Sequence, residues 1–112
     1  MSINPSPAFK ENLAQLPPCD DVAKITLSKK EGGAEAGVIE NKPGTGGSVK
    51  VYQYLLGLYG GEITRQAAYL GCALYGEHTD DAHKNPGNHG NIDRLMEVIK
   101  SGETLVGKVE KA

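Results

Sequence analysis

The chain has 112 residues, a formal net charge of −2 and 15 glycines, so we expect a single domain over residues 1–112. Residues 1–5 are predicted to form a disordered tail. No region is strongly basic and no apolar run reaches the ~18 residues of a membrane span, so we expect neither nucleic-acid nor membrane binding. Two cysteines without a CxxC spacing, and an N-terminus without a signal-peptide pattern, indicate a cytoplasmic protein.

The N-terminal half predicts a short helix followed by a β-hairpin. Apolar residues recur at helical spacing over 9–16, between a Ser6-Pro7 start and a Pro17-Pro18 stop. Polar and apolar residues alternate over 24–28, and 37–40 is a second strand candidate. We expect these two strands to pair antiparallel.

The C-terminal half predicts three helices and one strand. The first helix begins with Ser48 as its N-cap, the second runs from near Thr64 to about Gly76, and the third is capped by Asn91 and ends before Gly102. Residues 104–109 form a strand candidate beside the hairpin. The predicted fold class is therefore α+β: a small antiparallel sheet of two to three strands packed with about four helices.

All three histidines of the chain lie in one polar segment, residues 77–94. Imidazole and carboxylate are ligands for divalent zinc, manganese or iron, so the metal-site hypothesis uses His78, Asp81, His83, His89 and Asp93. The spacing matches neither H-E-x-x-H nor an EF-hand loop. The segment is thus enriched in ligand types without a recognised motif, and a divalent metal is a hypothesis for it.

Two other interpretations of this segment stay open. Its many Asp and Asn residues favour an ordered turn, because short polar side chains bond nearby backbone groups, and we prefer this interpretation. A metal-free acid/base site is the other, with His78 oriented by Glu77 or Asp81. Cys72 could serve there as a nucleophile, although a packed helix residue is the simpler role for it.

The stretch from Lys42 to Ser48 is a glycine-rich loop that enters a helix. Such a loop can hold an anion on backbone N–H groups at a helix N-terminus. The anion-site candidates are Lys42, Gly44, Gly46, Gly47 and Ser48. Neither G-x-G-x-x-G nor the Walker pattern fits, so a flexible connection is the simpler interpretation.

Several stretches carry a family resemblance: FKENLA at 9–14, IENKPG at 39–44, and EHTDDA at 77–82 with Pro86-Gly87, His89 and NIDRL at 91–95. On these stretches, the chain resembles a family of small bacterial proteins known as domain of unknown function 2322. The resemblance extends from about Phe9 to Ser101. It implies a soluble bacterial protein without an established activity, and it supplies no catalytic residue.

Two functions follow as hypotheses. The first, which we prefer, is a non-enzymatic binding or interaction module with an unidentified protein partner or a second copy of itself. Five tyrosines against one phenylalanine suit a contact surface. The alternative is a metal-dependent or acid/base enzyme that uses segment 77–94. No recognised catalytic motif supports it.

Overall fold

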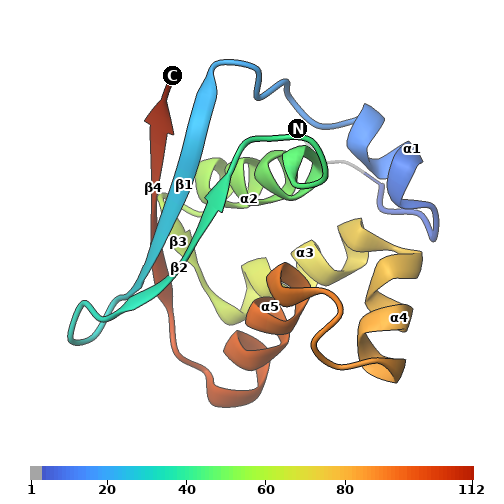
Figure 1. Ribbon diagram of the computed structural model, residues 1–112. Coiled ribbons are helices and arrows are strands. Elements are labelled where there is room, and N and C mark those ends of the chain that lie inside the picture. The colour runs from blue at the N-terminus through green and yellow to red at the C-terminus, as the bar shows by residue number, and fades with distance from the viewer. Residues whose placement is uncertain (1–3) are drawn as a thin grey trace.

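The computed structural model describes residues 4–112 and places its helices on one side of an antiparallel sheet (Figure 1). The nine elements are, in chain order, α1 (Phe9–Ala14), β1 (Val22–Lys29), β2 (Glu35–Glu40), α2 (Gly46–Leu58), β3 (Glu62–Ile63), α3 (Arg65–Tyr75), α4 (Glu77–Lys84), α5 (Gly90–Ser101) and β4 (Leu105–Lys111). The predicted α+β class is confirmed.

The sheet has the strand order β2-β1-β4-β3, and all of its neighbouring strands are antiparallel. The predicted hairpin is confirmed as β1 paired with β2, and the C-terminal strand lies beside it on β1. Ile25 and Leu27 of β1 point into the core, while Lys24 on the other face is exposed. This period of two explains why the pattern was readable from the sequence.

The prediction of two to three strands missed β3. This strand contains only Glu62 and Ile63, which pair with Val106 and Leu105 of β4. Two residues are too few to show an alternating pattern. The strand also follows Gly60-Gly61, which reads as a simple break between two helices.

The prediction of about four helices was one short of the five in the structure. The difference arises at Gly76, which has a φ of 56° and separates α3 from α4. This backbone conformation disfavours any residue with a Cβ. A Cβ at this position would also lie 2.5 Å from the backbone oxygen of Pro7. A contact distant in sequence therefore fixes the helix break.

Three predicted helix starts are displaced. The first helix begins at Phe9 rather than Pro7. Ser48 is not an N-cap, because α2 already begins at Gly46 after Thr45. Asn91 is not an N-cap either, because α5 begins at Gly90 after His89. Gly102 was predicted correctly: it has a φ of 77° and its N–H donates to Val98 O, as in a left-handed helix end.

The helices pack through a small-residue contact. Gly71 of α3 lies against Leu95 of α5 and Leu55 of α2, and a Cβ on Gly71 would be 2.7 Å and 2.9 Å from their methyl carbons. Tyr52 of α2 is fully buried nearby in the same core. Glycine at this position therefore lets α2, α3 and α5 approach one another closely.

The predicted tail at residues 1–5 lies partly outside the described residues, which begin at residue 4. Asn4 exchanges two hydrogen bonds with Gln15: its N–H donates to Gln15 Oε1 at 3.2 Å, and Gln15 Nε2 donates to its carbonyl at 3.1 Å. Within residues 4–112, no helix combines the length and the apolar content needed to cross a bilayer.

Candidate functional site

Three of the five predicted metal-site residues come together. His78 and Asp81 lie one turn apart on α4, and His89 returns after the Pro86–Gly87 turn at the start of α5. His89 Nε2 lies 2.7 Å from Asp81 Oδ2, and the two imidazole rings are 5.4 Å apart between centroids.

The other two predicted residues do not join this group. His83 is exposed on α4. The Asp93 carboxylate accepts the N–H of Gly87 at 3.0 Å and so holds the turn. Among residues 4–112, no set of three or more His, Cys, Asp or Glu side chains is arranged to hold a metal ion. A catalytic zinc site requires about three protein ligands, so the geometry offers a hydrogen-bonded pair instead of a metal-ligand set.

The Asp81–His89 contact favours the ionised form of Asp81 and determines which nitrogen of a neutral His89 ring carries the hydrogen. Hydrogen bonds from His89 and then Asn85 hold the pKa of Asp81 below its usual value. An ionised carboxylate only accepts hydrogen bonds, so the Nε2 of His89 carries the hydrogen. In the neutral imidazole, Nδ1 is then the free proton acceptor, as in sites where a carboxylate orients a general base.

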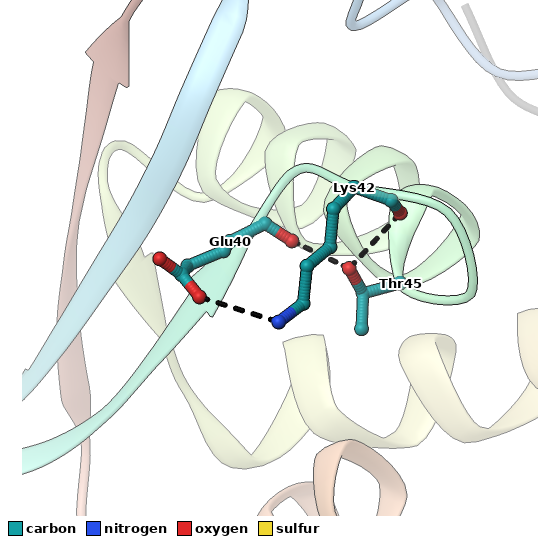
Figure 2. A network of polar contacts seen from close by, with 3 residues as sticks. All are labelled: Glu40, Lys42 and Thr45. Carbon is teal, nitrogen blue, oxygen red and sulfur yellow. Dashed lines mark hydrogen bonds and ion pairs between the residues drawn. The ribbon is translucent and has the colours of Figure 1, made fainter.

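Two polar side chains of the glycine-rich loop, Lys42 and Thr45, bond to neighbouring residues at the end of β2 and in the loop (Figure 2). Thr45 Oγ1 lies 2.5 Å from Glu40 O and 3.2 Å from Lys42 O, and does not cap α2. Lys42 Nζ lies 3.5 Å from the carboxylate of Glu40 in an exposed ion pair. Lys42, a predicted anion ligand, therefore points to Glu40.

The backbone of the same loop leaves donors free. The N–H of Gly46 donates to Lys42 O at 3.1 Å. The N–H groups of Gly47 and Ser48, in the first turn of α2, have no hydrogen-bond acceptor within residues 4–112. Orphan N–H groups at a helix N-terminus attract negative charge.

The glycine-rich loop and the histidine segment line one pocket of about 240 Å³. Its lining residues are Phe9, Gly44, Gly47, Ser48, Tyr75, His78 and His89. We call it the loop–histidine pocket. It brings together the two stretches that the sequence singled out, which are separated in the chain by most of α2 and by β3 and α3.

Aromatic rings build one wall of the loop–histidine pocket. Phe9 stacks on Tyr75 at 5.3 Å between ring centroids and meets His78 edge-on at 4.9 Å. A Cβ on Gly47 would lie 3.0 Å from the Phe9 ring, so this glycine allows the close approach. Tyr75 Oη donates to Ser48 Oγ at 2.7 Å, and burial raises the pKa of Tyr75, which keeps the phenol protonated.

The N-terminal segment is fixed over this wall by a polar anchor. Glu77 accepts the N–H of Phe9 at 2.8 Å and its own N–H donates to Pro7 O at 2.9 Å. The buried side chain of Asn12 accepts the N–H of Ser6 at 2.7 Å and donates to Leu74 O at 2.9 Å. These bonds hold Phe9 in the pocket wall.

Sequence reasoning did not assign Phe9 or Tyr75 to this pocket. It placed Phe9 on the apolar face of a short helix and counted Tyr75 among the five tyrosines that suit a contact surface. The pocket forms only where the α3–α4 corner meets α1. The conformational break at Gly76 creates that corner, and no sequence motif marks it.

Cys72 lies outside the loop–histidine pocket and lines a different cavity with Pro7 and Thr79. Burial raises the pKa of its thiol to about 11. A thiol is nucleophilic only as the thiolate. The geometry therefore does not support the hypothesis that Cys72 is a nucleophile near His78.

The tyrosines do not gather on one exposed surface. Tyr52 and Tyr75 are buried, Tyr54 and Tyr59 are half-buried, and Tyr69 alone of the five is largely exposed, at 58%. Tyr52 donates to Asn91 O and so helps to join α2 to α5.

A family model described as an uncharacterised protein conserved in bacteria, DUF2322, matches residues 9–109. The chain belongs to this family. The match contains both the glycine-rich loop and segment 77–94, so every residue that lines the loop–histidine pocket is within the DUF2322 match. Neither a curated protein nor a solved structure matches the chain.

Proposed function

We propose that this DUF2322 chain is a binding module for a small anionic ligand, of the phosphate or carboxylate class, in the loop–histidine pocket. The observation that carries the proposal is the shared pocket itself. Gly47 and Ser48, with their unpaired N–H groups, and the imidazoles of His78 and His89 all line it. Backbone N–H groups are donors that suit an anion. The His89 Nε2–H donates to Asp81, so His89 offers an N–H to the pocket, at Nδ1, only when its ring is protonated.

The elements around the pocket add electrostatic support. Ser48 lies in the first turn of α2, His78 in the first turn of α4, and His89 is the N-cap of α5. The N-terminal end of a helix carries partial positive charge. Three such ends at one pocket favour a negatively charged ligand, although no lysine or arginine lines it.

Pocket size limits the ligand. Pockets for drug-sized molecules measure roughly 300–1,000 Å³, and this one measures about 240 Å³. A phosphate, a short carboxylic acid or the phosphate group of a small metabolite fits this space. The ligand would be no larger than a few heavy atoms beyond its anionic group.

The test is an NMR titration of the protein with inorganic phosphate and with acetate, with urea as a neutral probe of similar size. We expect saturable shifts of the Gly47 and Ser48 amides and of the His78 and His89 rings with an anion, and none with urea. His89→Gln should weaken the binding at least fivefold.

His83→Gln is the matched control, because His83 lies on the same polar segment but is exposed and outside the pocket. It should bind the anion as the unchanged protein does. Unsaturable shifts, or equal effects of the two histidine variants, would show that the pocket is not the binding site.

Acid/base catalysis on the bound ligand is a second candidate function, and the 2.7 Å contact between Asp81 and His89 favours it. Asp81→Asn would keep the size of the side chain and weaken the orientation of the imidazole. For an enzyme, this variant should lower turnover of a small phosphate ester tenfold or more and leave phosphate affinity within twofold. A pure binding module shows no turnover with either chain.

A further inference from the structure

The C-terminal half of β4 is an unpaired sheet edge. β4 pairs with β1 along its whole length, but it pairs with β3 only at Leu105 and Val106. The last contact on that side is the N–H of Gly107, which donates to Gly61 O at 2.9 Å. From Lys108 onward no strand of the described chain covers this side of β4 (Figure 1).

The backbone groups on that edge face outward in a defined order. Gly107 N–H points away from β1, toward Gly61, and Ala112 N–H points to Asp21 O on the β1 side. Backbone groups alternate along a strand. The N–H and C=O of Val109 and Lys111 therefore face the open side. An edge of this kind is a template for another strand.

An apolar groove of about 570 Å³ runs beside the open edge. It lies between α2 and β4, and its lining includes Tyr54, Leu58, Val109 and Lys111. Leu58 is 51% exposed. Gln53 Oε1, also in the groove lining, is a buried oxygen atom without a hydrogen-bond partner within residues 4–112. The groove therefore exposes apolar surface and leaves a buried acceptor for the donor of an occupant.

We propose that this edge pairs with the same edge of a second copy of the chain, antiparallel and centred on Val109. The two Val109 residues would then exchange two backbone hydrogen bonds. Gly61 already lies beside Gly107, so the ladder spans residues 108–110. Lys111 of each copy then lies at the partner groove, and its ammonium, which contacts Asp21 Oδ2 at 2.9 Å in the single chain, exchanges that exposed contact for one near Gln53.

Charge complementarity selects this occupant and this register. Lys108 and Glu110 lie on the outer face of the sheet, and each stands opposite the other residue of the second copy. Opposite charges at facing positions stabilise a strand pair. Other antiparallel registers would also let the open-side N–H and C=O groups face each other. Each of these would place like charges opposite one another: Lys108 against Lys108, Glu110 against Glu110, or Lys111 against Lys111. The strand is therefore complementary to itself in one register.

The test is a charge swap followed by sedimentation between 1 and 200 µM. The unchanged chain should form a concentration-dependent dimer, and Lys108→Glu or Glu110→Lys alone should weaken it at least tenfold. Mixing the two variants in equal amounts should restore a dimer, because each copy then supplies the charge that the other lacks. The double variant K108E/E110K should dimerise like the unchanged chain.

Lys10→Glu is the control for net charge, because Lys10 is exposed on α1 and far from β4 in sequence. It should leave the dimer unchanged. A monomer at every concentration, or single variants that dimerise as the unchanged chain does, would overturn the proposal. Circular dichroism checks that Glu110→Lys, which loses a hydrogen bond from Thr26, stays folded.

Discussion

The guanidinium of Arg94 fills the space beside Gly37 that a larger residue would need. A Cβ at Gly37 would overlap Arg94 Nη2, and the φ of Gly37 is 148°. Arg94 is held there by Ala36 O at 3.2 Å, Asn91 Oδ1 at 2.9 Å and the Tyr52 hydroxyl at 3.3 Å. One side chain thus ties β2 to α2 and α5.

Gly37→Ala should therefore lower the free energy of unfolding by about 1–3 kcal/mol, from backbone strain and overpacking together. Urea denaturation measures the change. Gly90→Ala is the control, since its Cβ would meet nothing within 4 Å and its φ is not positive. In an Arg94→Lys background, Gly37→Ala should lower the free energy of unfolding by a smaller amount. Equal stability of the two glycine variants would contradict the steric argument.

Gly71 lies in the middle of α3 and Gly57 in the last turn of α2, and alanine substitutions at the two positions should change stability in opposite directions. Alanine is favoured over glycine in a helix interior by about 1 kcal/mol. Gly57→Ala meets open space and should stabilise the protein. Gly71→Ala would press on Leu95 and Leu55, and overpacking of about 1–3 kcal/mol should outweigh the helix preference. Thermal unfolding at low micromolar concentration compares the two variants, and a stabilising Gly71→Ala would refute the packing account.

The free energy of unfolding should decrease at acidic pH, in part because Asp81 becomes protonated. Its pKa is lowered in the folded chain, first by His89 and then by Asn85. A lowered pKa contributes stability above the unfolded value of 3.8, and this contribution is lost as pH falls through the folded value. Between pH 6 and pH 3, Asp81→Asn should therefore lose less melting temperature than the unchanged chain. A parallel loss in both chains would mean that the contact does not persist in solution.

Cys72 should react slowly with iodoacetamide. Burial raises the pKa of its thiol from 9.0 to about 11, so the thiolate fraction at pH 8 falls roughly a hundredfold. A Cys19→Ser background isolates the measurement, because Cys19 is the other cysteine and is buried. The unfolded chain in guanidinium should react at the rate of a free thiol. Fast alkylation of the folded chain would show that Cys72 is open and activated.

The sequence by itself determined the elements whose periodic apolar pattern continues over many residues. The alternation in β1 and the apolar faces of α2, α3 and α5 follow from local spacing, so the α+β class and the pairing of the hairpin were predictable. The sequence also marked the two stretches that carry the candidate site. Their residue types, glycine in one and histidine in the other, are unusual without any knowledge of the fold.

Only the tertiary structure decided what these stretches do together. Gly76 breaks the helix because Pro7 passes across it, and Phe9 enters the pocket because Glu77 holds its N–H. These are contacts between residues about 68 positions apart. A periodic pattern contains no information about such distances. The convergence of Ser48, His78 and His89 on one pocket, and the open edge at β4, therefore emerged only from packing.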